Sequence, residues 1–198
     1  MSLTKTTKLQ AINTMLSAVG EPPVNSLTAL RADSLIAQNI LDEVTRDVQS
    51  YGWLFNTEDN VELVPETGTG YIYIGDNVAR VDMDPAYYNY DITIRGNRLY
   101  DRKTNSYAFY GPIKVTRVML MEYDEMPEVA RRYVFIRAAR IFQDRVVGSE
   151  RLHMFTQADE IAALARMSEH ENETGDYTIF QSPDIARTFI RQGQYRVY

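Results

Sequence analysis

Two histidines are the first candidates for catalysis or metal binding in this sequence of 198 residues. His153 and His170 lie 17 residues apart on one predicted helix, which is roughly 26 Å at 1.5 Å per residue. They therefore cannot share a metal ion. Neither lies in a recognisable motif for nucleophilic or acid–base catalysis, so we expect both to be surface residues.

Pairs of carboxylates are the second candidates, because glycoside hydrolysis needs only two of them, one on either side of a sugar. Asp82 with Asp84, or Asp124 with Glu125, could supply such a pair, with nearby tyrosines as sugar platforms. However, 27 acidic residues in 198 produce such pairs by chance, and a helix-cap role explains Asp124 without catalysis. These carboxylates alone do not predict a catalytic site.

Motifs for cofactors are also missing from the sequence. The stretch "ETGTGYIYIG" contains G-x-G, but no third glycine follows at the dinucleotide spacing and no helix begins after it. We expect a hairpin turn there. Cysteine is absent, which excludes disulfides, thiolate metal sites and cysteine nucleophiles. The sequence thus predicts no catalytic residues, no cofactor and no metal.

The charge of the chain limits its partners. A net charge of −6 argues against sequence-independent nucleic-acid binding, which depends on many phosphate contacts from a basic surface. Only four of the 21 basic residues are lysine, and there are 14 tyrosines; arginine and tyrosine are both favoured in protein interfaces, although genome base composition can also favour arginine. No secretory signal or membrane span is recognisable, so we expect a soluble protein made in the cytoplasm.

The first predicted helix ends abruptly. Apolar residues recur at spacings of three and four over residues 9–19, as on one face of an amphipathic helix. Gly20 suits a left-handed residue just past the helix, and Pro22 and Pro23 prevent its continuation. We call residues 20–23 the elbow. The elbow either fixes the angle between the first two helices or is a plain connector.

A second helix is expected to run to about Tyr51, capped by Asn25, Ser26 or Thr28. After Gly52, the only tryptophan, Trp53, is interpreted as a core residue where helix meets sheet. The apolar stripe of this helix comprises Leu35, Ile36, Ile40, Leu41, Val44 and Val48.

Between residues 54 and 121 the pattern changes to alternation of apolar and polar residues, rich in Val, Ile, Thr and Tyr. Gly96-Asn97 suits a two-residue hairpin turn with positive backbone angles. Helical periodicity then returns, with Asp124 as a cap, Pro127 in the first turn and Gly148 at the end of a third helix. This helix has a wide apolar surface and five arginines: Arg131, Arg132, Arg137, Arg140 and Arg145.

A fourth helix is predicted from about Glu150 to Glu171, with an acidic end that should fray. Its apolar residues are Leu152, Phe155, Ile161, Leu164 and Met167. The last segment contains Gly and Pro breaks but many large apolar residues, so we expect an arm that docks on a partner.

The whole pattern predicts an α+β fold: an antiparallel four-helix bundle with an inserted small antiparallel β domain and an extended C-terminal arm. The expected boundaries are 1–53 and 122–175 for the two halves of the bundle, 54–121 for the β domain, and 176–198 for the arm. Predicted interface residues are Arg131, Arg132 and Arg145, beside the apolar stripes of the third helix, and Ile185, Phe189, Ile190 and Tyr195 in the arm.

Three stretches resemble the tail tubular protein A family of T7-like, short-tailed bacteriophages: "AINTMLSAVGEPPVNSL", "SYGWLFN" and "YDEMPEVARRYVFIRAARIFQDRVVGS". The match keeps the same order and spacing from about residue 9 to 150; beyond Glu150 the similarity is one of pattern only.

The resemblance implies a non-enzymatic structural protein of the virion tail, assembled in the host cytoplasm. It implies a ring of about twelve copies that joins the portal protein to the tail nozzle (tail tubular protein B) and helps to attach the tail fibres. From the charge and the lack of a long apolar segment, we expect neither specific nucleic-acid binding nor membrane insertion. The alternative is a tail-associated hydrolase that acts on host-surface polysaccharide, because such activity has been proposed for some members of the family.

Overall fold

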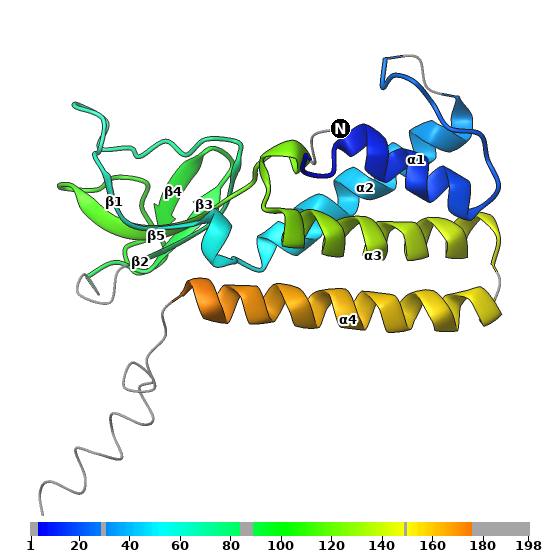
Figure 1. The fold of residues 1–198 in the computed structure, drawn as a ribbon. Helices are drawn as coiled ribbons and strands as arrows, with labels where there is room; N and C mark the ends of the chain where they lie inside the picture. The colour runs from blue at the N-terminus through cyan, green and yellow to red at the C-terminus, as the bar shows by residue number, and fades with distance from the viewer. Residues whose placement is uncertain (1–3, 29–30, 84–88, 149, 176–198) are drawn as a thin grey trace, which may run out of the picture.

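The computed structural model describes residues 4–28, 31–83, 89–148 and 150–175, which form a helical part and a β part side by side (Figure 1). The helices are α1 (Lys8–Ala18), α2 (Ala32–Ser50), α3 (Glu128–Val146) and α4 (Glu150–Thr174), with short 3-10 turns η1 (Leu54–Asn56) and η3 (Tyr123–Glu125). The strands are β1 (Thr57–Leu63), β2 (Val78–Met83), β3 (Ile92–Arg95), β4 (Arg98–Asp101) and β5 (Ile113–Met119).

Helix α3 organises the helical part, because it packs against α1, α2 and α4. Helices α3 and α4 run antiparallel along their length, with α1 and α2 on the other side of α3 (Figure 1). All four helices contribute to one core, which includes Ile12, Leu41, Phe142 and Met167. Trp53 packs against this core, as expected, and its Nε1 donates to the Val48 carbonyl at 2.8 Å.

The end of α1 is a Schellman motif, in which the amides after the helix bond back to its last carbonyls. The Glu21 amide donates to the Leu16 carbonyl at 3.0 Å and the Gly20 amide to the Ser17 carbonyl at 3.2 Å. Gly20 has a φ of +85°, the left-handed conformation predicted for it. The helix stop expected from the sequence is therefore confirmed.

The predicted start of the second helix is wrong. Helix α2 begins at Ala32, and its N-cap residue, Arg31, makes no side-chain capping bond. Ser26 and Thr28 instead bond to each other through their hydroxyls at 2.7 Å. The connection is held to α1 by Asn13, whose side-chain amide exchanges two hydrogen bonds with the backbone of Val24, at 2.8 and 2.9 Å. The elbow is thus the start of a longer connection, which is hydrogen-bonded to α1.

Several apolar residues predicted for the core are exposed. Leu35 and Ile36 on α2, and Ile161 on α4, have exposed fractions of 50%, 43% and 63%. On α2 and α4, the apolar stripe is therefore wider than the surface that neighbouring elements of this subunit cover. Helix α4 also continues beyond the predicted end, to Thr174.

The β part consists of two antiparallel sheets, one with the order β1–β5–β2 and one formed by β3 and β4. A bulge bends β1 between Glu58 and Val61, where Asn60 has a φ of +57°. The inner faces share a second apolar core that includes Ile72, Leu99 and Val115.

The β3–β4 hairpin turns at Gly96-Asn97, as predicted. Gly96 has a φ of +61°, whereas Asn97 does not have a positive φ. This is the pattern of a type II′ turn, in which glycine takes the first central position.

Two buried amides join the helical part to the β part. Gln49, near the end of α2, donates through Nε2 to the Met121 carbonyl at 3.0 Å and accepts from the Met121 amide at 2.9 Å. Asn56 donates to the carbonyls of Gln49 and Met119, at 2.9 and 2.7 Å. Because these amides are buried and fully engaged, they hold the end of α2 rigidly against the end of β5.

The structure thus confirms a mixed α+β fold. The four-helix bundle and the domain boundaries stay predictions, and the expected arm lies outside the described residues.

Candidate functional site

The two histidines lie on α4, as predicted, and His170 is exposed; the side chain of His153 is not among those described. Within the described ranges, no three His, Cys, Asp or Glu residues gather closely enough to hold a metal ion. No helix in the same ranges is both long and apolar enough to cross a membrane.

The candidate carboxylate pairs are engaged in structural contacts. Asp82 forms an ion pair with Arg80 of the same strand at 2.8 Å, and Asp84 lies outside the described residues. Asp124 does not cap α3, which begins at Glu128 after the N-cap residue Pro127. Its carboxylate instead accepts a hydrogen bond from the Lys8 amide at 2.8 Å and so satisfies the start of α1.

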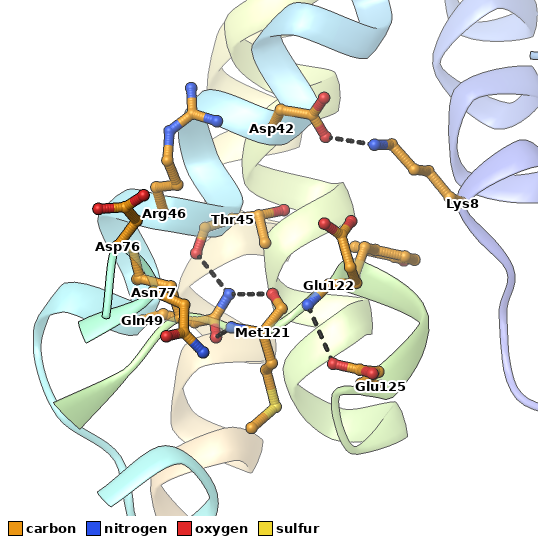
Figure 2. Close-up of a pocket in the computed structure, with 12 residues that line it drawn as sticks. Lys8, Asp42, Thr45, Arg46, Gln49, Asp76, Asn77, Met121, Glu122 and Glu125 are labelled. Atoms are coloured by element: carbon orange, nitrogen blue, oxygen red, sulfur yellow. Dashed lines mark hydrogen bonds and ion pairs between the residues drawn. The ribbon is translucent and has the colours of Figure 1, made fainter. Parts of the chain in front are cut away.

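A groove of about 550 Å³ lies where the helical and β parts meet. Figure 2 shows that α2 supplies one wall and the segment after β5 another, with Lys8 at the edge. Lys8 forms an ion pair with Asp42 at 2.7 Å, and Glu125 accepts from the Glu122 amide at 3.3 Å.

Among the residues that the structure describes, Tyr123 is the only aromatic one that lines this junction groove. Its side chain is buried, which raises the pKa of its hydroxyl, and the hydroxyl donates to the Arg131 carbonyl at 3.1 Å. The groove therefore offers no open aromatic platform for a sugar. Its polar groups mainly join α1, α2 and the segment after β5.

A second groove, of about 500 Å³, does combine aromatic and acidic residues. Tyr51 and Trp53 line it, with ring centres 5.1 Å apart, together with Asp59 and Glu171. Asp59 accepts from the Thr116 hydroxyl at 2.7 Å, and Glu171 accepts from the Leu54 amide at 2.7 Å. Sequence reasoning missed this groove, because Asp59 and Glu171 are distant in the chain.

The arginines of α3 mostly bind inside the subunit. Arg131 is buried, and its guanidinium donates to the carbonyls of Thr6 and Met126, both at 2.8 Å, and to that of Asp124. It thereby ties the N-terminal segment to the start of α3. Arg131 is therefore engaged within its own subunit, and its role at an interface stays a prediction.

Two more of these arginines, Arg137 and Arg140, connect α3 to the flanking helices. Arg137 donates to Asp47 of α2 at 2.8 Å, and Arg140 pairs with Glu160 of α4. Burial lowers the pKa of both arginines, but hydrogen bonds and nearby acidic groups raise it by more. The pKa of each arginine therefore lies above its ordinary value.

Arg145 binds both carboxylate oxygens of Glu43 on α2, at 3.1 and 3.3 Å. The hydrogen bond and charge of Arg145 lower the pKa of the Glu43 carboxyl. Arg132, in contrast, is exposed and has no side-chain partner in the part of the chain that the structure describes. The remaining predicted interface residues, Ile185, Phe189, Ile190 and Tyr195, lie outside that part.

Comparison with known proteins assigns the chain to a family. Residues 9–177 match the tail tubular protein family. The chain belongs to this family. It is also 26% identical, over 164 residues, to "Tail tubular protein A" of Klebsiella phage KP34, a match that covers 82% of this chain and 86% of that protein.

Members of the tail tubular protein family are structural, so this chain is a structural component of a bacteriophage tail. A tail protein needs surfaces for neighbouring virion proteins, and large apolar side chains are exposed on α2, α3 and α4 or at their ends. Those most exposed on the helices and their ends are Leu35, Tyr51, Val147, Met154 and Ile161. Such residues are the usual contacts in permanent assemblies.

Proposed function

We propose that this tail tubular protein is the adaptor of a short-tailed phage, in which about twelve copies form a ring between the portal protein and the tail nozzle. The ring also helps to attach the tail fibres. Family membership over residues 9–177 is the observation that carries the proposal. In this proposal the helices act as one four-helix bundle, and residues 176–198 act as an arm that binds a partner.

The architecture of the subunit supports an adaptor role. The buried Gln49 and Asn56 amides join its two parts rigidly, and the arginines of α3 hold α2 and α4 in place. A subunit with this internal bracing can transmit force between two partners without deforming. Arg132 and Arg145 remain proposed interface residues. Arg145 would contact the neighbouring subunit while it also binds Glu43 of its own subunit.

Electron microscopy of the full chain mixed with the portal and nozzle proteins of the same phage tests the proposal. We expect a ring of this chain between the two, and a monomer or small oligomer when the chain is alone. Arg132→Glu should weaken binding within the ring, whereas the same charge change at Lys114, exposed on β5, should not. Absence of binding to both portal and nozzle would contradict the adaptor role.

The groove lined by Tyr51, Trp53, Asp59 and Glu171 favours one alternative, a tail-associated hydrolase of host-surface polysaccharide. The alternative predicts release of reducing sugar from host capsule by the purified chain. It also predicts that Asp59→Asn and Glu171→Gln each abolish the release, while Asp82→Asn, outside the groove, has no effect. No release by the intact chain excludes this function for the capsule tested.

A further inference from the structure

The outer face of the β3–β4 hairpin carries two arginines without an acidic partner. Arg95 and Arg98 lie directly opposite each other, on either side of the turn at Gly96. Among the described residues, neither guanidinium has an ion pair or a side-chain hydrogen bond. Like charges directly opposite destabilise a strand pair, so an anion from outside the subunit would relieve this repulsion.

Tyrosine rings hold both guanidinium groups in place. The Arg95 Cζ lies 3.6 Å from the centre of the Tyr100 ring, and the Arg98 Cζ lies 4.6 Å from the Tyr107 ring and 5.1 Å from the Tyr71 ring. A guanidinium stacked on a ring keeps the N–H groups at its edge available for an oxyanion. We call these five residues the Arg–Tyr patch.

A carboxylate is a better ligand for the Arg–Tyr patch than a nucleic acid. The chain has a net charge of −6, which repels a polyanion. Tyr100 is buried, and Arg98 already lies beside the rings of Tyr71 and Tyr107. The tyrosines therefore do not form the open stacking surface that single-stranded nucleic acids use.

The last turns of α4 present a complementary pair of carboxylates. Glu169 and Glu173 are exposed, and no ion pair satisfies either one within the described ranges. They are four residues apart on a helix, which sets their Cβ atoms about 5–6 Å apart, close to the roughly 4.5–5.5 Å between opposite residues of two strands. The last turn of α4 has no basic residue, and the helix dipole disfavours glutamate there.

We propose that the Arg–Tyr patch of one subunit binds Glu169 and Glu173 of a second copy of this chain. The proposal rests on the proposed function in taking a second copy as the partner. Because the two surfaces differ, the contact is head-to-tail and closes into a ring when the rotation between copies permits. It places the β part of each subunit against the end of α4 in the next.

Disulfide trapping tests this contact directly, because the natural chain contains no cysteine. Asn97→Cys puts a thiol in the turn between the arginines, and Asn172→Cys puts one beside the glutamates on exposed helix surface. After mixing and mild oxidation of the two full-length variants, we expect the 97–172 dimer to exceed the 97–97 and 172–172 dimers at least tenfold on a non-reducing gel. Equal yields, or no 97–172 dimer, would overturn the proposal.

Charge reversal then tests the pairing of residues. Arg95→Glu with Arg98→Glu, or Glu169→Arg with Glu173→Arg, should each lower the 97–172 yield at least tenfold, and both reversals in every copy should restore it. Lys5→Glu with Lys114→Glu changes the net charge by the same amount as the arginine reversal, at exposed sites outside both surfaces, and should leave the yield unchanged. Circular dichroism confirms that each variant folds.

Failure of the combined reversal to restore the dimer would overturn the proposal. The proposal would also be overturned if Arg95→Glu with Arg98→Glu abolished binding to a single-stranded oligonucleotide and left the 97–172 dimer unchanged. That result would identify the patch as a nucleic-acid site. Portal binding is measured separately. Rings on the portal without the 97–172 disulfide would refute this contact and leave the adaptor role intact. A trapped 97–172 dimer without portal binding would support the contact and contradict the adaptor role.

Discussion

At the scale of single residues, Arg131 and Arg132 are adjacent in sequence, but Arg131 is buried and Arg132 is exposed. Arg131→Ala removes one buried hydrogen bond, to the Met126 carbonyl, and two partly buried ones, to the carbonyls of Thr6 and Asp124. We predict that it lowers the free energy of unfolding by about 2–4 kcal/mol, because the buried Met126 carbonyl and two partly buried carbonyls lose their partner. Urea unfolding measures the change.

Arg132→Ala is the matched control, because Arg132 is exposed. It should change the free energy of unfolding by no more than about 0.5 kcal/mol. Equal effects of the two substitutions would show that the hydrogen bonds of Arg131 do not stabilise the subunit.

Asp101 is a second residue that holds local structure, at the end of β4. Its carboxylate accepts hydrogen bonds from the amides of Asp91, Lys103 and Thr104 and from the Thr104 hydroxyl, at 2.6–3.2 Å. Burial raises the pKa of Asp101, but these hydrogen bonds together outweigh it, and the pKa lies below its ordinary value. The ionised form is therefore favoured in the folded chain.

We predict that Asp101→Asn lowers the free energy of unfolding at pH 7 by about 1–3 kcal/mol, because an amide nitrogen replaces one acceptor oxygen. A folded-state pKa below the unfolded value of about 3.9 gives stability that is present above pH 4 and lost as the pH falls through the folded pKa. The difference between the two chains in urea unfolding should thus shrink at low pH. Asp82→Asn, which disrupts an exposed ion pair, should cost less than about 1 kcal/mol.

At the scale of elements, backbone chemistry was predictable where it is local. Gly20 and the Gly96-Asn97 turn were identified from residue type and spacing alone. The start of α2 was not, because the Asn13 side chain binds the Val24 backbone and so holds the chain after α1 against that helix. That contact joins residues 11 positions apart, beyond the reach of capping rules.

The candidate sites show the same limit. The arginine content of α3 was evident, but its partners Glu43, Asp47 and Glu160 come from other helices. Apolar periodicity identified the face of α2 that contains Leu35, yet only packing decides which part of that face is covered. The sequence therefore predicted the composition of these surfaces without separating internal contacts from exposed ones.

A glycine substitution tests the stop of α1. Gly20→Ala places a side chain at a φ of +85°, although no atom lies within 4 Å of the added Cβ. We predict a loss of about 1–2 kcal/mol in the free energy of unfolding, from the backbone alone. Gly111→Ala adds a Cβ in open space without a positive φ, and should be nearly neutral in thermal melting. An unchanged melting temperature for Gly20→Ala would contradict a structural role of this cap.

At the scale of the whole molecule, the junction of helical and β parts relates structure to assembly. Gln49 and Asn56 bond to the backbone on both sides, so the two parts behave as one body under load. The Arg–Tyr patch lies on the β part and its proposed partner on α4. A rigid junction would fix the angle between these two surfaces, and hence the rotation from one copy to the next in a closed ring.

The last prediction concerns residues 176–198, of which all but the first two lie beyond the match to the family. This segment contains Ile185, Phe189 and Ile190, at spacings that suit one short amphipathic turn. Burial of each side chain in a partner would contribute on the order of 1.5–3 kcal/mol, before the entropic cost of fixing the segment. We therefore predict that a chain ending at residue 175 melts within about 2 °C of the full chain but no longer attaches stably to the portal.

A full-length chain with Ile185→Ser, Phe189→Ser and Ile190→Ser is the matched variant for this deletion. If apolar burial in the partner supplies the affinity, the triple substitution should abolish portal attachment as completely as the deletion, while the melting temperature stays unchanged. Attachment that survives the substitution but not the deletion would assign the binding to backbone or polar contacts. A large fall in the melting temperature of both variants would mean that these side chains belong to the subunit's own core, and the proposed arm would have to be abandoned.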